Sequence, residues 1–299
     1  MPNEMASEKI SIEGLAKRIH EEVYRRFYTY KTTVFLCGAG PDTKGSVREQ
    51  IKDALLSARN SYRYDVFFPE DLFEELISGP RRQDLISLEN MLADSVDAVV
   101  LAVESKGAIA ELGSFASNPK LRKKLVCLVD QRYKKARSFI NYGPIRLLKD
   151  KKEGKVLYID FSRAASDIDS IRGAISRARK SSSKLADLAN VVQAHHFVLP
   201  CIYLLEPVDR ERLVLLVRYA SGRDEKSAEA LTAGALAMLN KNREVQVTPE
   251  GYRLSQAGLA RFAGLERRGR AGRTVNVGAM DALRVAILNM QCRGKPLVM

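Results

Sequence analysis

The 299-residue chain contains no tryptophan, only three histidines and only four cysteines. The cysteines lie far apart and form no C-x-x-C pair, which argues against a zinc site and a disulfide framework and fits a reducing cytoplasm. His195 and His196 are adjacent, and neighbouring side chains on a helix diverge. We therefore expect no metal site and no catalytic histidine, and we interpret Cys37 and Cys127, within apolar runs, as small core residues.

Long apolar runs are also missing, since none approaches the roughly 20 residues that span a bilayer. Residues 1–9 mix acids and bases with no apolar core after them, so we expect a cytoplasmic protein with neither a signal peptide nor a membrane partner. Acidic residues are outnumbered, 36 against 49 basic ones, and the formal net charge is +13. This excess favours a polyanionic partner, with nucleic acid ahead of an anionic membrane.

Five short apolar runs alternate with helical patterns over the first half of the chain. The runs are residues 33–37, 65–68, 98–103, 125–129 and 156–159. Helices are predicted between them, for example at 47–58, where Ser46 and Glu49 form a capping box, and at 85–95. This alternation predicts an α/β fold with a doubly wound, mostly parallel five-stranded sheet.

The second half follows a different pattern. A helix at 228–240, strands at 244–248 and 252–254 around the turn Pro249-Glu250-Gly251, and a helix from Ser255 predict a winged helix-turn-helix domain. The helix at 228–240 is nearly uncharged, whereas a helix that reads base edges carries Arg, Lys, Asn or Gln. We interpret this domain as docking protein, or as contacting only a nucleic-acid backbone.

These patterns divide the chain into five parts. They are an N-terminal helical arm (1–30), an α/β domain (31–162), a Ser/Ala/Arg-rich helical spacer (163–195), a winged-helix domain (196–265) and a basic tail with a final helix (266–299).

One segment carries the main chemical signal. The apolar run 98–103 breaks at Glu104-Ser105, passes Gly107, and continues as a predicted helix with Glu111 in its first turn. In open α/β sheets ligands bind beyond the carboxyl ends of the strands, where a glutamate can attack an electrophilic sugar carbon. The alternative, with equal weight from this segment alone, is a solvated carboxylate favoured by the helix dipole.

Other candidate residues follow the same ends of the predicted strands. The substrate-binding candidates are Gly38, Ala39, Gly40, Glu70, Asp71, Glu104, Ser105 and Gly107. Glycines let a ligand approach the backbone closely. Glu70 and Asp71 suit ribose hydroxyls, or else they only cap the helix that follows. Several carboxylates around one pocket match the needs of N-glycosidic chemistry.

A basic segment spans residues 120–152, with twelve cations against two acids and interleaved aromatic residues. A charge run is often only a solvated face, but this density and the aromatics favour phosphate and base contacts. The nucleic-acid-binding candidates are Lys120, Arg122, Lys123, Lys124, Arg132, Lys134, Lys135 and Arg137. Within the segment, the uncharged loop 138–144 is interpreted as lining the pocket, with Asn141 and Tyr142 as substrate contacts.

Six segments together resemble the effector proteins of bacterial retron antiphage systems. They are residues 33–40, 67–73, 85–90, 111–115, 137–148 and 199–205. Those effectors are similar to nucleoside 2-deoxyribosyltransferases and carry a C-terminal winged helix. The likeness covers residues 32–150 well and includes the start of the second domain.

The resemblance implies an N-glycosidase toxin with Glu111, in its Glu-Leu-Gly match, as nucleophile and the loop 38–40 beside the sugar. Where transferases of the family place a base-orienting acid, this chain has Ser105 with Glu104 beside it, which points away from ordinary deoxyribosyl transfer. The implied reaction is hydrolytic loss of the base, with NAD as substrate and no cofactor or metal. The implied partners are the retron reverse transcriptase and its RNA–DNA hybrid product, which restrain the toxin in a higher-order complex.

Two other functions remain open at this stage: a non-catalytic nucleotide sensor, and a winged-helix nucleic-acid-binding regulator. The nearly uncharged helix at 228–240 argues against the regulator. The sequence also leaves open whether NAD, a nucleoside monophosphate or a base within nucleic acid is cleaved.

Overall fold

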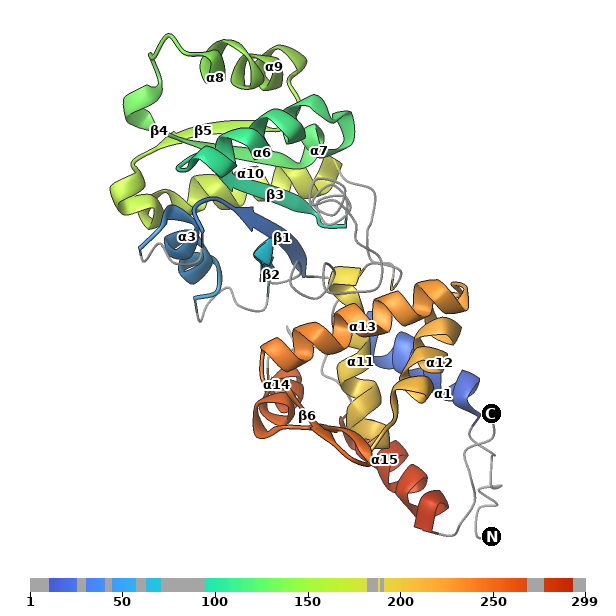
Figure 1. Cartoon of the computed structure of the whole chain (residues 1–299). Helices are drawn as coiled ribbons and strands as arrows, with labels where there is room; N and C mark the ends of the chain where they lie inside the picture. The colour runs from blue at the N-terminus through green and yellow to red at the C-terminus, as the bar shows by residue number, and fades with distance from the viewer. Residues whose placement is uncertain are drawn as a thin grey trace. The chain divides into compact units, whose positions relative to one another are not determined.

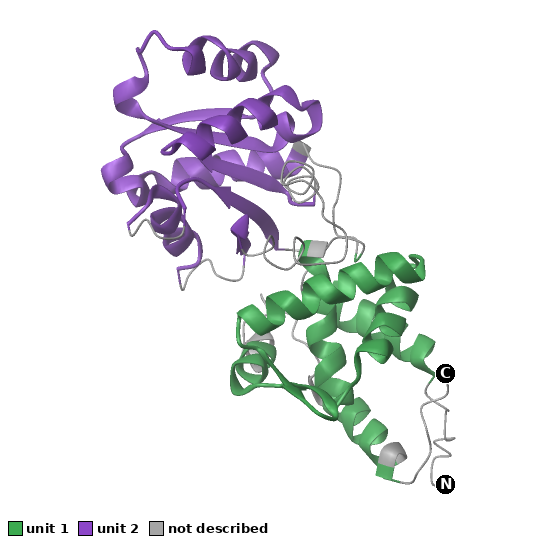
Figure 2. Ribbon diagram, viewed as in Figure 1, with its two compact units in different colours: residues 1–30, 186–299 green, residues 31–185 purple. Residues whose placement is uncertain are grey.

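The computed structural model describes residues 11–25, 31–40, 45–57, 63–70, 95–181, 188, 191–267 and 277–292. The chain divides into two compact units (Figure 2), Lys31–Leu185 and Met1–Tyr30 with Ala186–Met299. Asp71 and residues 85–94 of a predicted helix lie outside the described residues. Among the helices that are described, none is both long and apolar enough to cross a membrane.

The unit Lys31–Leu185 is built on one five-stranded sheet (Figure 1). Its strands are β1 (Thr32–Cys37), β2 (Tyr64–Phe67), β3 (Ala98–Ala102), β4 (Leu125–Asp130) and β5 (Lys155–Ile159). Their order is β2-β1-β3-β4-β5 and every pair is parallel. The predicted α/β class with a parallel five-stranded sheet is confirmed. β1, β3 and β4 are buried along their whole length, because helices cover both faces of the sheet.

Helices cover the two faces of this sheet. They are α3 (Val47–Leu55), α6 (Lys106–Ser117), α7 (Pro119–Lys124), α9 (Pro144–Lys151) and α10 (Ile168–Ser181), with the short turn η3 (Phe161–Asp167). The turn η2 (Gln131–Tyr133) and α8 (Phe139–Tyr142), which contacts α9, bury no residue. Alternate strand residues such as Val34 and Val100 pack with α3 and α10 in one cluster. The helices α6, α7 and α9 contact β3, β4 and β5 outside that cluster, which gives the doubly wound arrangement.

The segment expected as a spacer contributes to this unit. α10 buries Ile171, Ala174, Ile175 and Ala178 against the sheet. Their i, i+3, i+4, i+7 spacing is an amphipathic stripe, which the Ser/Ala/Arg composition of the segment obscures. α10 is therefore a structural layer of the sheet domain, and the interpretation as a spacer is wrong for these residues.

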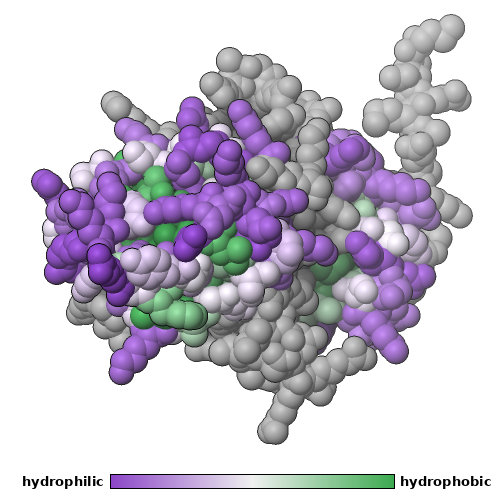
Figure 3. Space-filling view, turned by 90° about the horizontal axis from the view of Figure 1, so that it is seen from above, coloured by the Kyte–Doolittle hydropathy of each residue, from purple (hydrophilic) through white to green (hydrophobic). Residues whose placement is uncertain are grey.

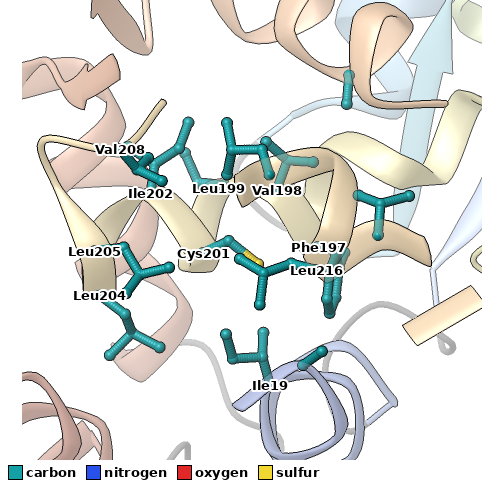
Figure 4. Packing of buried hydrophobic residues seen from close by; sticks show 14 of the residues in the cluster. Ile19, Phe197, Val198, Leu199, Cys201, Ile202, Leu204, Leu205, Val208 and Leu216 are labelled. Carbon is teal, nitrogen blue, oxygen red and sulfur yellow. The ribbon is translucent and has the colours of Figure 1, made fainter. Parts of the chain in front are cut away.

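The other unit is mainly helical. It contains α1 (Ile12–Ile19), η1 (His20–Tyr24), α11 (Val191–Leu205), α12 (Arg210–Ser221), α13 (Glu225–Lys241), β6 (Val245–Thr248), β7 (Gly251–Leu254), α14 (Gln256–Arg267) and α15 (Val277–Cys292). Its core joins the N-terminal helix to helices of the second half of the chain: Ile19 of α1 packs in one cluster with Phe197 of α11 and Leu216 of α12 (Figure 4). The Tyr24 hydroxyl also donates a hydrogen bond to Gln193 at 2.7 Å. The helix expected as an N-terminal arm is thus part of the core of this unit.

A two-stranded antiparallel hairpin, β6–β7, lies between α13 and α14 in the chain, at the expected positions. Gly251 begins β7 with a φ of +131°, and a Cβ there would lie 2.5 Å from the Val208 carbonyl oxygen. Glycine is therefore required at this point of the hairpin.

The adjacent histidines behave differently from the expectation. Both are buried on α11, with ring centroids 3.8 Å apart. The Arg261 guanidinium lies 3.1 Å from His195 Nε2 and 3.2 Å from His196 Nδ1, and it also forms an ion pair with Glu244 at 2.6 Å. Because a guanidinium only donates, the two ring nitrogens that face it accept. The expectation that the rings diverge is wrong, since Arg261 holds both.

Candidate active site

The sheet order sets where a ligand is expected. In the order β2-β1-β3-β4-β5 the chain reverses its direction of winding between β1 and β3, and the helices that follow these strands, α3 and α6, cover opposite faces. Ligands of such sheets bind in the crevice at this switch point, beyond the carboxyl ends of the strands. The predicted loop 38–40 follows β1 and the predicted pair Glu104-Ser105 follows β3, so the fold brings both to the switch point.

Glu104 joins the two loops directly. Its Oε1 accepts a hydrogen bond from the Ala39 N–H at 3.2 Å, and its Oε2 accepts one from the Val47 N–H at 3.1 Å. A Cβ on residue 38 would lie 2.9 Å from Glu104 Oε1, so Gly38 permits this close approach. Both carboxylate oxygens are engaged by the backbone. The expected substrate contact therefore positions the glycine loop and the start of α3.

α6 starts earlier than the sequence pattern indicates. It begins at Lys106, and the Ser105 Oγ accepts a hydrogen bond from the Ala108 N–H at 3.1 Å as the N-cap. Glu111 therefore lies in the second turn, and its predicted first-turn position is wrong. Ser105, a predicted substrate contact, is a helix cap in the structure.

Glu111 sits on the border between the buried and the exposed face of α6. Ala108, Leu112 and Phe115 are fully buried, whereas Glu111 is partly exposed with its Oε2 atom inaccessible to solvent. The residues four before and three after it, Gly107 and Ser114, have small side chains, and such residues flank it on the helix surface. The carboxylate thus lies between these two small residues on one side and the buried Ala108 and Phe115 on the other.

Glu70 follows β2 and forms an ion pair that the sequence analysis missed. Both of its carboxylate oxygens accept from the Arg48 guanidinium, at 2.9 and 3.0 Å. The Arg48 side chain is only 3% exposed, whereas that of Glu70 is 36% exposed, and Arg48 also lies over the Phe68 ring at 4.7 Å. The available signal was a charge on the apolar face of α3, because Arg48, Ile51 and Leu55 share one face at i, i+3, i+7.

The remaining strand ends also carry paired carboxylates. Asp130, the last residue of β4, accepts from the Arg132 guanidinium at 2.6 Å, and these hydrogen bonds lower the pKa of Asp130 below its ordinary value. Asp160, after β5, accepts from the Ser162 hydroxyl at 2.7 Å and from Arg163 at 3.2 Å. These contacts lower the pKa of Asp160 as well. Asp130 and Asp160 are thus held ionised by neighbours in the chain.

The basic segment separates into inward and outward residues. Arg122 is buried and donates to Glu153 at 2.6 Å and to the Ala116 carbonyl at 3.1 Å. Lys124 is buried too. Both were predicted to bind nucleic acid, and burial at the end of α7 rules out that surface role. The other candidates are exposed: Lys120, Lys123, Arg132, Lys134, Lys135 and Arg137.

The loop expected to line the pocket instead forms α8. The Asn141 side chain donates to the carbonyls of Tyr133 and Ala136, at 2.9 and 2.6 Å, and so ties α8 to the preceding turn. Tyr142 is 60% exposed and Phe139 is 86% exposed. This degree of exposure is that of an outer surface, and the role of Tyr142 as a substrate contact stays a prediction.

Comparison with known proteins decides the family. Residues 44–247, which run from before α3 into β6, match the family described as STM3845 retron effector protein. The chain belongs to the retron effector family. The match includes Glu111, α8 and α11 to α13, so it draws on both units of this retron effector.

Two relatives from Escherichia coli give the comparison more detail. The "Retron Ec86 putative ribosyltransferase/DNA-binding protein" is 33% identical over 296 residues, which cover 95% of this chain and 92% of the relative. The protein of the same description from retron Ec73 is 28% identical over 143 residues, 46% of this chain and 45% of the relative. The resemblance inferred from the sequence motifs is thereby confirmed at the level of the family.

Proposed function

We propose that this retron effector hydrolyses the N-glycosidic bond of a nucleotide, with NAD as the substrate and Glu111 as the nucleophile. The observation that carries the proposal is the position of Glu111. It stands on the helix that leaves β3, next to the switch point at which the loops of Gly38 and Glu104 meet. The printed name of the relatives, ribosyltransferase, supports chemistry at a ribosyl carbon.

In this mechanism a Glu111 oxygen bonds to the ribose C1′ while the C1′–N bond breaks and its electron pair leaves with the base. Water then adds to C1′, the bond to Glu111 breaks, and the proton of the water passes to solvent. The pyridinium ring of NAD leaves as neutral nicotinamide without being protonated. Because nicotinamide needs no proton to leave, such a substrate suits a site in which Glu104, beside the glycine loop, already accepts two backbone hydrogen bonds.

The decisive experiment measures nicotinamide release from NAD by the purified chain, together with cellular NAD and growth during expression. Glu111→Gln should lower the rate by a factor of at least about 10² and remove the growth arrest, because the amide keeps the shape but is no nucleophile. Asp169→Asn, an exposed change on α10 at the opposite face of the sheet, is the control and should keep the wild-type rate.

Base release at the wild-type rate by folded Glu111→Gln would refute the nucleophile. If the chain releases a base from other nucleotides but not from NAD, the substrate is instead a nucleoside monophosphate or a base in nucleic acid. A Glu111→Gln variant that still binds nucleotide and supports defence would indicate a sensor.

The partners in the proposal are the retron reverse transcriptase and its RNA–DNA hybrid, which restrain the effector in a cytoplasmic complex. The helical unit has the element order of a winged helix-turn-helix, with α12 and α13 joined through Gly222 and with β6–β7 as the wing. The exposed start of α13 carries Glu225 and Glu229, which disfavours contact with a DNA groove. We therefore assign the protein partner to this unit and the nucleic acid to the exposed lysines and arginines that follow β4.

A further inference from the structure

The surface built by η2 and α8 combines exposed aromatic rings with positive charge. Tyr133, Phe139 and Tyr142 are 57%, 86% and 60% exposed, although aromatic side chains gain most when buried. The face that carries α8 and α9 is seen from above in Figure 3, where green hydrophobic side chains are framed by purple hydrophilic ones. An exposed apolar patch with a polar frame is typical of a binding surface.

This surface is held in a fixed shape. The two hydrogen bonds from the Asn141 side chain to the Tyr133 and Ala136 carbonyls join α8 to the turn that carries Tyr133. Gly143 ends α8, and a Cβ there would lie 2.8 Å from the Phe139 carbonyl oxygen. The aromatic residues therefore project from a framework that is already ordered, so a ligand has little conformational entropy to remove.

Positive charge surrounds these rings. The Arg132 guanidinium lies 5.8 Å from the centre of the Tyr133 ring. Lys134 and Lys149 lie 5.7 and 5.0 Å from a fourth ring, that of Tyr158 in β5, which is not part of this surface. Lys135 and Arg137 are exposed between Tyr133 and Phe139 in the chain. Of the two acids in this segment, Asp130 is buried against Arg132 and Asp150 is paired with Arg146. The surface is thus complementary to a polyanion that also has flat aromatic rings available for stacking.

We propose that this surface, Tyr133, Phe139 and Tyr142 with the surrounding lysines and arginines, binds a single-stranded stretch of nucleic acid by stacking unpaired bases on the aromatic rings. A duplex keeps its base faces within its own stack and presents phosphates, so a ring reaches those faces only by unstacking a base step, whereas the unpaired bases of a single strand are free to stack on aromatic side chains. The inference rests on the nucleic-acid partner of the proposed function and is independent of the proposed N-glycosidic reaction.

The test is fluorescence anisotropy of the full chain with a labelled single strand of about 20 nucleotides and with a blunt duplex of the same sequence, long enough to exceed one such site. Phe139→Leu should weaken single-strand binding about ten-fold or more and leave duplex binding unchanged, because leucine keeps an apolar side chain but has no aromatic face. Phe139→Trp should retain single-strand binding. At 86% exposure neither change disturbs the core.

A second pair of variants supplies a matched control. Tyr133 and Tyr219 are both exposed tyrosines with an arginine 5.8 Å over the ring, but Tyr219 belongs to α12 of the other unit. Tyr133→Ala should weaken single-strand binding several-fold, whereas Tyr219→Ala should not.

Several results would overturn the inference. The first is equal affinity of the wild-type chain for the single strand and the duplex. The second is an equal loss of single-strand affinity in Phe139→Leu and Phe139→Trp. The third is unchanged single-strand affinity in all aromatic variants. A change in self-association or in binding to anionic vesicles, with single-strand binding intact, would assign the surface to a second copy or to a membrane. Loss of nicotinamide release with single-strand binding intact would assign the rings to the catalytic pocket. If the chain releases no base from any nucleotide but the anisotropy results hold, only the proposed reaction fails.

Discussion

The Glu104 carboxylate accepts a hydrogen bond from the backbone N–H of Val47, the first residue of α3, at 3.1 Å. With its other oxygen on the Ala39 N–H, it connects the end of β3 to the loop and helix that follow β1. A negative charge at a helix N-terminus is favourable, and here it comes from the chain itself. One backbone N–H at the N-terminus of α3 is therefore already occupied by a carboxylate of the chain.

Glu104→Gln should lower the free energy of unfolding by about 1–3 kcal/mol, because an amide offers one acceptor oxygen where the carboxylate offered two charged ones. The melting temperature and the KM for nucleotide should shift together. Glu49→Gln is the control, since Glu49 is an exposed carboxylate that accepts from the Gly45 N–H at the start of the same helix. If both variants lower the free energy of unfolding equally, Glu104 has no special role in joining the glycine loop to α3.

The Arg48–Glu70 pair should respond asymmetrically to removal of each partner. Glu70→Ala leaves a buried guanidinium without its carboxylate and should lower the free energy of unfolding by about 3 kcal/mol. Arg48→Met leaves a carboxylate that water reaches and should lower it by about 1 kcal/mol. Denaturant unfolding of both variants and of the double variant measures the difference. If Arg48→Met proves the more damaging change, the burial argument fails.

Binding of nucleic acid should depend steeply on salt and reside in the exposed cations after β4. Each phosphate contact contributes about 0.7 to 0.9 to the slope of log affinity against log salt, so Lys134→Glu with Lys135→Glu should reduce that slope by about 1.5. The charge-matched control is Arg210→Glu with Lys226→Glu in the helical unit, both at exposed positions. A control that weakens binding equally would move the nucleic-acid site to α12 and α13.

Thiol labelling at pH 8 should modify Cys292 and spare the other three cysteines. Cys37, Cys127 and Cys201 are buried, and burial raises the pKa of Cys127 to about 12 and that of Cys201 well above its ordinary value. A thiol with that pKa is ionised in only about one molecule in ten thousand at pH 8, and the thiolate is the reactive form. Cys292→Ser should therefore abolish rapid reaction with a thiol reagent in native protein. Rapid labelling that survives this change would contradict the described packing.

The local pattern of the sequence was enough to predict the sheet. Apolar runs of strand length alternate with helical stretches, and such strands can be buried only between two helical layers, which leads to a parallel five-stranded sheet. The Ser46 cap of α3 and the hairpin around Pro249-Glu250 were likewise predictable, because caps and tight turns depend on residues close together in the chain. The retron family could be recognised from short motifs for the same reason.

Contacts between distant residues were decided only by the tertiary structure. The sequence places Glu104 after a strand but cannot tell that Ala39 and Val47 come within hydrogen-bond distance, because this depends on β1 and β3 being neighbours. It shows Arg122 and Lys124 as part of a charge run, and only the packing of α7 turns them inward. It shows Phe139 in an apolar loop, and only the fold leaves the ring in water. A residue type sets what a side chain can do, and the strand order and helix packing set what it meets.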